Sequence, residues 1–122
     1  MATSKSIWLP EPEEHDFPAA ADYLELLYDS QTVEAMVAGL RGVKTITKKA
    51  KDIFRASALP LLPEKNIHVQ ENLKKFRKGK KLSPILLVRG KDKLIIADGY
   101  HRMCAGYYLS EDLIIPCRLF GL

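Results

Sequence analysis

Hydrophobic side chains recur along this chain with two different spacings, and the spacing changes near the middle. From Phe17 onward, apolar residues lie three and four positions apart with acidic residues between them, which is the pattern of an amphipathic helix. Ser30 is a suitable N-cap for a second helix that ends near Gly42. The same spacing predicts a third helix from about Thr45. We therefore expect a helical first half with short connections.

The second half mixes helical spacing with short apolar runs that are typical of strands. Pro60 and Pro63 make residues 58–63 an extended connection, because proline cannot donate to a helix or a central strand. The pattern then predicts a helix from near His68 to Lys78, strands over 84–88 and 94–97 joined by a hairpin turn, a helix after Asp98-Gly99, and a last strand over 114–120. These elements predict an α+β fold with a small mixed sheet, preceded by a helical N-terminal portion.

Three parts of one compact unit are expected: a flexible acidic arm over 1–16, a helical extension over 17–57 and a sheet-bearing core over 58–122. A chain of 122 residues has room for one domain but hardly for two. No apolar run approaches the roughly 18–20 residues of a membrane span, and the first ten residues lack the apolar stretch of a secretory signal. Two cysteines, Cys104 and Cys117, are too few for a disulfide scaffold and lack metal-ligand spacing. The expected location is the cytoplasm, with no membrane partner.

The net charge of +4 conceals an uneven distribution. Residues 1–40 carry eight acidic residues and one basic residue, whereas residues 41–122 carry 18 basic and seven acidic residues. One short window holds nine bases and a single acid, Asp92. The basic residues are Lys74, Lys75, Arg77, Lys78, Lys80, Lys81, Arg89, Lys91 and Lys93. Such a density predicts a basic patch for nucleotide phosphates or a nucleic-acid backbone, although a solvated surface or docking of the acidic segment on the basic one also explains it.

The run Asp98-Gly99-Tyr100-His101-Arg102 is the segment most suggestive of chemistry. An apolar strand passes directly into a helix, whose first N–H groups have no partner within the helix and attract anions. A glycine lets a phosphate approach the backbone, and an arginine binds phosphate oxygens in a bidentate manner. The alternative is purely structural, with Asp98 as N-cap and Gly99 as a tight turn.

Asp98 and His101 lie three residues apart, so Asp98 would orient or charge the imidazole, or hold a divalent ion. In an enzyme these two residues would form the general-base pair. Glu71, at the start of the fourth helix, offers a further carboxylate, although capping explains it as well. His15 and His68 have no neighbouring partner in the sequence, and we assign them no role.

Three segments match the pattern of a known family. Residues 73–88 match a helix, a glycine and a Pro-Ile-hydrophobic-Val strand, residues 95–102 are similar to an Asp-Gly-x-His-Arg signature, and residues 114–117 match a closing hydrophobic-Pro-hydrophobic strand. Together they resemble the ParB/sulfiredoxin-like fold, also called the ParB-like nuclease domain. The resemblance covers Leu73 to Phe120 and leaves the helical portion without a family.

This resemblance implies a nucleotide site. In relatives, the Gly-x-x-Arg turn binds the phosphates of ATP, CTP or another nucleotide, which implies that role for Gly99, His101 and Arg102. Tyr100, Lys81 and Ser83 would assist, and a nucleoside triphosphate with Mg²⁺ is the implied ligand. Sulfiredoxins carry their catalytic cysteine directly before the His-Arg pair, where this chain has Tyr100, so that activity is not expected. Partition proteins continue into a helix-turn-helix domain, and nothing follows residue 122 here, so sequence-specific DNA partitioning is not expected either.

Three functions therefore stay open. The first is a nucleotide- or phosphate-binding protein that hydrolyses or transfers a phosphate, or only binds it. The second is a nucleic-acid-binding or nuclease-like module acting through the Lys74–Lys93 patch, with the acidic helices as an autoinhibitory cover or as the arm of a homodimer. The third is a non-catalytic interaction protein. The sequence does not decide whether the chain is an enzyme.

Overall fold

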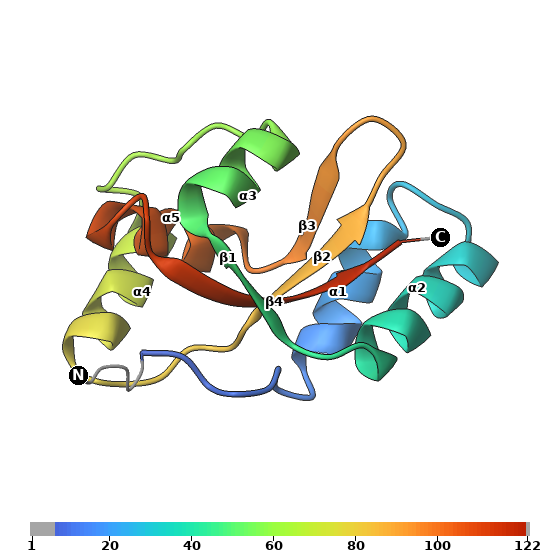
Figure 1. The fold of residues 1–122 in the computed structure, drawn as a ribbon, viewed down its shortest axis with the longest axis horizontal. Helices are drawn as coiled ribbons and strands as arrows, with labels where there is room; N and C mark the ends of the chain where they lie inside the picture. The colour runs from blue at the N-terminus through green and yellow to red at the C-terminus, as the bar shows by residue number, and fades with distance from the viewer. Residues whose placement is uncertain (1–6, 122) are drawn as a thin grey trace.

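The computed structural model describes residues 7–121, which form five helices and one four-stranded mixed sheet (Figure 1). In chain order the elements are α1 (Asp16–Leu24), α2 (Ser30–Gly42), β1 (Ile46–Lys49), α3 (Ala50–Ser57), α4 (Ile67–Arg77), β2 (Ile85–Arg89), β3 (Leu94–Asp98), α5 (Tyr100–Leu109) and β4 (Ile114–Phe120). The expected α+β class is confirmed, as are helices before the core of the sheet. Within the described residues, none of the helices has the length and apolar character needed to cross a membrane.

The strand order in the sheet is β1-β4-β2-β3. The last strand, β4, lies between two earlier ones: it is antiparallel to β1 and parallel to β2. Strands β2 and β3 form the expected hairpin, which is antiparallel with a register shift between Leu86 and Leu87. A hydrogen bond from the Gly90 N–H to the Lys93 carbonyl at 2.9 Å closes it. The sequence pattern predicted β2, β3 and β4 to within a residue or two of their observed bounds.

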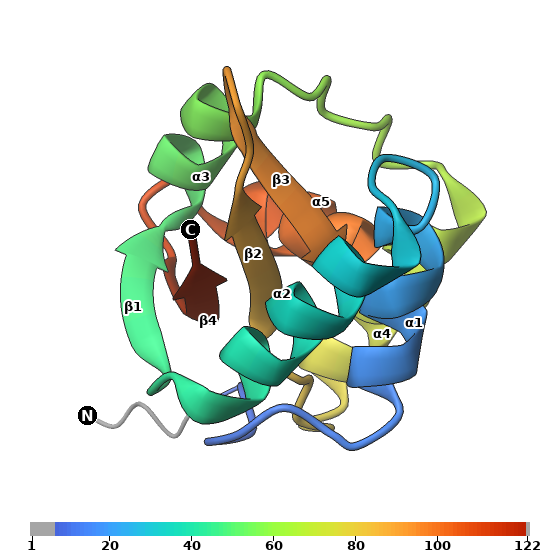
Figure 2. The same cartoon turned by 90° about the vertical axis from the view of Figure 1, so that its right-hand side faces the viewer.

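Helices cover both faces of the sheet (Figure 2). Successive residues of β2 alternate between two cores: Ile85 and Leu87 pack with α3, α4 and α5, while Leu86 and Val88 pack with α1 and α2. All four side chains are buried, which explains why this strand reads as a continuous apolar run instead of an alternating one. Helices α1 and α2 therefore supply the helical side of one of the two cores.

The expected third helix from about Thr45 is wrong in its first turn. Residues Ile46–Lys49 form β1, an exposed edge strand whose Ile46 lies opposite Cys117 of β4, and α3 begins only at Ala50. Pairing with β4 outweighs the local helical spacing, since the β-branched pair Ile46-Thr47 suits a strand. Segment 17–57 thus contributes a strand as well as helices.

The part of the acidic arm that the structure describes lies against the core. Trp8 is only 7% exposed, and its ring meets Phe76 edge-on with 5.4 Å between centroids. The Leu9 N–H donates to the Leu82 carbonyl at 2.7 Å, and the Leu82 N–H donates to Ile7 at 3.1 Å. Residues 1–6 of the arm lie outside the described residues. Residues 7–9 therefore run beside Leu82, and this contact brings residues 13–16 to the site described next.

Candidate functional site

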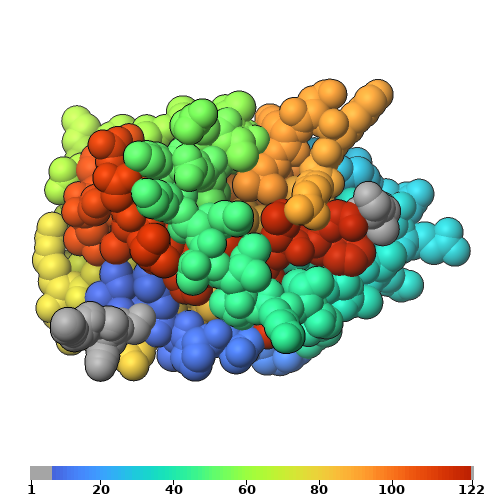
Figure 3. All heavy atoms as spheres, in the orientation of Figure 1, coloured from blue at the N-terminus to red at the C-terminus, as the bar shows by residue number. Residues whose placement is uncertain are grey.

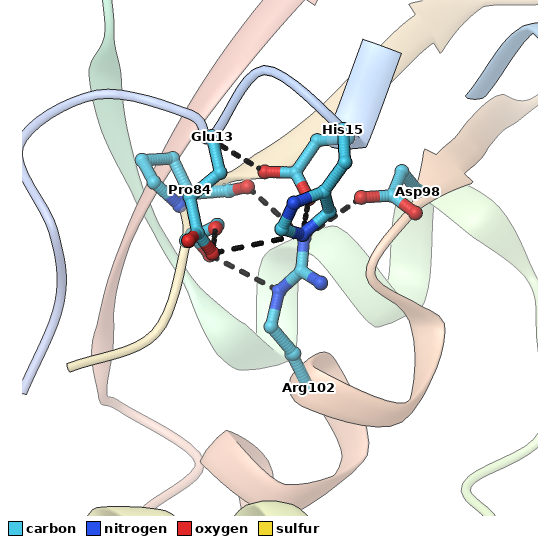
Figure 4. Close-up of polar contacts among 7 residues, drawn as sticks. Glu13, His15, Pro84, Asp98 and Arg102 are labelled. Carbon is cyan, nitrogen blue, oxygen red and sulfur yellow. Dashed lines mark hydrogen bonds and ion pairs between the residues drawn. The ribbon is translucent and has the colours of Figure 1, made fainter. Parts of the chain in front are cut away.

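Arg102 is the centre of the strand-to-helix turn. From the first turn of α5, its Nε donates to the Ser83 carbonyl at 3.1 Å, and its Nη2 donates to the Pro84 carbonyl at 3.2 Å and to Asp98 Oδ2 at 3.0 Å (Figure 4). The side chains of Arg102 and Asp98 are each 17% exposed. Among residues 7–121, Nη1 has no hydrogen-bond partner. Two of its nitrogens thus hold the fold together, and the donors of the third have no partner among the described residues.

Gly99 makes the close approach of Arg102 possible. Its φ of +110° lies in the left-handed region, and an added Cβ would lie 2.6 Å from Ile85 Cδ1 and 3.0 Å from Arg102 Nη2. Gly99 is itself the N-cap residue of α5, which has no side-chain cap. The structural alternative, in which Asp98 caps the helix, is therefore wrong, because its carboxylate pairs with Arg102.

A second carboxylate, Asp16 at the start of α1, lies against Asp98. Asp16 is 2% exposed and accepts a hydrogen bond from the Glu13 N–H at 2.9 Å. Burial raises the pKa of Asp98, the Arg102 guanidinium opposes that shift, and the charge and hydrogen bond of Asp16 add to it. The site therefore holds two carboxylates beside one arginine, and the ordinary ionisation of Asp98 is disfavoured.

Glu13 and His15 join this cluster from the arm. The Ser83 hydroxyl donates to Glu13 Oε1 at 2.7 Å, and His15 Nε2 lies 3.5 Å from Asp16 Oδ1. One ligand atom from each of Glu13, His15 and Asp16 lies within 4.8 Å of the other two. The arrangement has the donor set of a cation site, although acidic groups on a surface often gather without an ion.

Two adjoining cavities, of about 270 and 200 Å³, open beside Arg102 and share Asn72, Lys75 and Arg102. We call them together the polar groove. The first also has Glu13, His15, Lys80, Lys81, Leu82 and Ser83 in its wall, and the second has His68, Glu71, Asp98, Gly99, Tyr100 and His101. The groove thus has a cationic half at the end of α4 and a half with carboxylates and imidazoles at the start of α5.

All three histidines of the chain line the polar groove. The rings of His68 and His101 lie 4.9 Å apart between centroids, with planes inclined by 58°. Burial lowers the pKa of His101, and the neighbouring His68 adds to the shift. The imidazole of His101 is therefore neutral near pH 7 and has a nitrogen lone pair free to accept a proton or a metal.

The structure gathers most of the residues expected at the site. Lys81, Ser83 and the run from Asp98 to Arg102 all line the groove, with Lys75 and Lys80 from the basic window. Tyr100 lines it too, while its hydroxyl donates to the Pro60 carbonyl at 2.6 Å. The expected contact of Asp98 with His101 is replaced by the pair with Arg102.

The basic window does not form one patch. The β2–β3 hairpin, which carries Arg89, Lys91 and Lys93, projects at the top of the view in Figures 1 and 3, whereas α4 lies at the lower left. Lys91 and Lys93 line a separate cavity of about 320 Å³ together with apolar residues of α1 and the segment after it. Of the six bases from Lys74 to Lys81, three line the groove, namely Lys75, Lys80 and Lys81, and the other three are exposed outside it. We call these six residues the cationic surface.

Sequence reasoning missed the residues that only the tertiary fold brings to Arg102. These are Glu13, His15, Asp16 and His68, all remote from the motif in sequence. A hint was available for His68, because Asn66 is a good N-cap and places His68 in the first turn of α4. Comparison with known proteins found no matching family model, curated protein or solved structure.

Proposed function

We propose that this chain binds a phosphorylated small molecule, a nucleotide, in the polar groove, as the resemblance to the ParB-like family implies. The observation that carries the proposal is the convergence of Lys75, Lys80, Lys81 and Arg102 on one cavity of about 270 Å³. Arg102 Nη1 offers unused donors at that point, and guanidinium donors bind phosphate oxygens strongly. Glu13 is the one carboxylate in this wall, so the cationic half has a net positive charge.

The second half of the groove suits the remainder of such a ligand. Gly99 has no side chain to obstruct the first turn of α5, whose free N–H groups attract an anion. Mg²⁺ accompanying a triphosphate prefers oxygen ligands, and Asp98 and Glu71 supply carboxylates in this wall. In the metal-free site, the imidazole of His101 is the group in this wall that would accept a proton from water if a phosphate ester were hydrolysed. Binding alone requires only the cationic half.

Calorimetric titration with pyrophosphate, ATP and CTP, with and without Mg²⁺, tests this proposal. Lys75→Ala should weaken binding about 10- to 150-fold, since a hydrogen bond to a charged group contributes about 1.5–3 kcal/mol. Lys74→Ala is the matched control: Lys74 is the adjacent residue of α4, is equally exposed and lies outside the groove. Equal losses in both variants, or no binding of any of the three ligands, would contradict the proposal.

A second candidate is nucleic-acid binding through the cationic surface from Lys74 to Lys81. It is favoured by the exposed bases that continue past the groove, Lys74, Arg77 and Lys78. Binding to duplex DNA should then weaken steeply with salt, because each phosphate contact releases counterions. The double variant Lys80→Glu/Lys81→Glu should abolish it, and Lys91→Glu/Lys93→Glu on the distant hairpin should not. Insensitivity to salt would count against this candidate.

A further inference from the structure

His68 and His101 stand side by side in the polar groove, each in the first turn of its helix. Their ring centroids are 4.9 Å apart, and α4 and α5 pack against each other. Two imidazoles bound to one zinc at about 2.0–2.1 Å, through an approximately tetrahedral angle, have centroids about 5 Å apart. The observed spacing of the two ring centroids therefore agrees with that of two imidazoles that share one ion.

Carboxylates lie beside the two rings. Glu71 Oε1 lies 3.4 Å from His68 Nδ1, and histidines that bind a metal through one ring nitrogen commonly have a carboxylate at the other. Asp98 and Glu71 line the same cavity and add oxygen donors to its wall.

We propose that His68 and His101 form a binding site for a borderline-soft divalent metal such as Zn²⁺. Imidazole nitrogen suits zinc, nickel, copper and cobalt, whereas Mg²⁺ prefers oxygen, so this is not the ion that would accompany a triphosphate. Two protein ligands leave the other positions of a tetrahedral ion to water or to ligand oxygens. The site does not depend on phosphate binding.

A titration of untagged protein with Zn²⁺ tests the site. Binding is measured by calorimetry, and the ligands are identified from the imidazole nitrogen resonances in NMR spectra. One Zn²⁺ per chain should bind, and the resonances of His68 and His101 should shift while those of His15 should not. His68→Ala and His101→Ala should each lower the affinity at least about 10-fold, and Glu71→Gln should lower it by a similar factor through loss of its contact with His68. His15→Ala should bind as the wild type does.

Two results would overturn the proposal. One is the absence of Zn²⁺ binding by the wild type. The other is loss of binding in His15→Ala with retention in both His68→Ala and His101→Ala, which would move the ion to the Glu13–His15–Asp16 cluster. His68 has a side chain 60% exposed, so its variant should keep the apo melting temperature, and the NMR shifts require no variant at all.

The proposed zinc site and the proposed phosphate site can be refuted independently of each other. Lys75→Ala should retain Zn²⁺ binding while it loses pyrophosphate, because Lys75 is not a metal ligand. His68→Ala should retain pyrophosphate binding, because His68 lines only the other half of the groove.

Discussion

Replacing Arg102 with methionine removes the guanidinium and keeps most of the apolar stem. Three hydrogen bonds are lost, to Ser83, Pro84 and Asp98. The greater cost comes from Asp98, whose carboxylate stays largely buried beside Asp16 without its counter-ion. The substitution therefore leaves a largely buried carboxyl group and two carbonyls without the donors that Arg102 supplies in the wild type.

The size of the effect follows from the burial of the pair. Removing one partner of a buried ion pair costs about 3–5 kcal/mol, and because the Arg102 and Asp98 side chains are each 17% exposed, we expect the lower end, about 3 kcal/mol. A chain of this length loses about 4 °C of melting temperature per kcal/mol. Arg102→Met should therefore lower the melting temperature by about 12 °C.

Urea unfolding followed by fluorescence of Trp8, the single tryptophan, measures this free energy. A double-mutant cycle with Asp98→Asn isolates the pair, and we expect a coupling energy of about 1–3 kcal/mol between these contacting residues. A loss below about 1 kcal/mol in Arg102→Met would refute the role of Arg102 as the tie between α5 and the start of β2. Additive effects in the cycle would refute the pair of Arg102 with Asp98.

The difference in unfolding free energy between the wild type and Asp98→Asn should change with pH in one direction. The pKa of Asp98 is raised in the folded state. The folded protein therefore binds a proton at Asp98 more tightly than the unfolded chain does, and protonation of Asp98 stabilises the fold. That stabilisation is fully present below the unfolded pKa of about 3.9 and is lost as the pH rises through the folded pKa. The wild type should therefore gain stability relative to Asp98→Asn as the pH falls from 7 toward about 4, and a difference that is constant or shrinks over this range would contradict the buried carboxylate pair.

Three further measurements test other parts of the structure. Gly99→Ala should cost about 2–4 kcal/mol of unfolding free energy, from left-handed strain and the clash of the new methyl group, whereas Gly42→Ala, with no atom within 4 Å, should be neutral in the same urea titration. Trp8→Ala should cost about 3–5 kcal/mol and make the arm cleavable by protease, and an uncleaved arm would contradict its docking. Cys104 and Cys117 are buried, which raises the pKa of Cys104 and raises that of Cys117 to about 11, so both should react with a thiol reagent only as fast as the protein unfolds.

The hydrophobic pattern of the sequence was sufficient to predict those elements whose conformation depends mainly on their own residues. The hairpin and the last strand were located because apolar runs with turn residues between them have few other solutions. Residues 46–49 were not predicted to form a strand, because β1 is a four-residue edge strand with every side chain exposed. Such a strand has no burial pattern, and its identity comes from pairing with β4 far along the chain.

The candidate site also has one part that the sequence predicted and another that it did not. The run from Asp98 to Arg102 could be recognised from the sequence because its geometry is set by a strand end, a glycine and a helix start. The partners of that run could not, since Asp16 and His68 reach it from other elements. The chosen partner of Asp98 was also missed, because the competition between capping and pairing with Arg102 depends on how deeply both groups are buried.

The position of β4 between β1 and β2 constrains how the chain reaches its native state. Until residues 114–120 are in place, β1 has no strand beside it and one side of the apolar strand β2 has unpaired N–H and C=O groups. The β2–β3 hairpin is a local structure and can form early, but the sheet closes only through contacts between distant segments, which are slow to form. During that interval the open edge of β2 is a template for pairing with another chain. Variants that weaken β4 should therefore aggregate during refolding out of proportion to their loss of equilibrium stability.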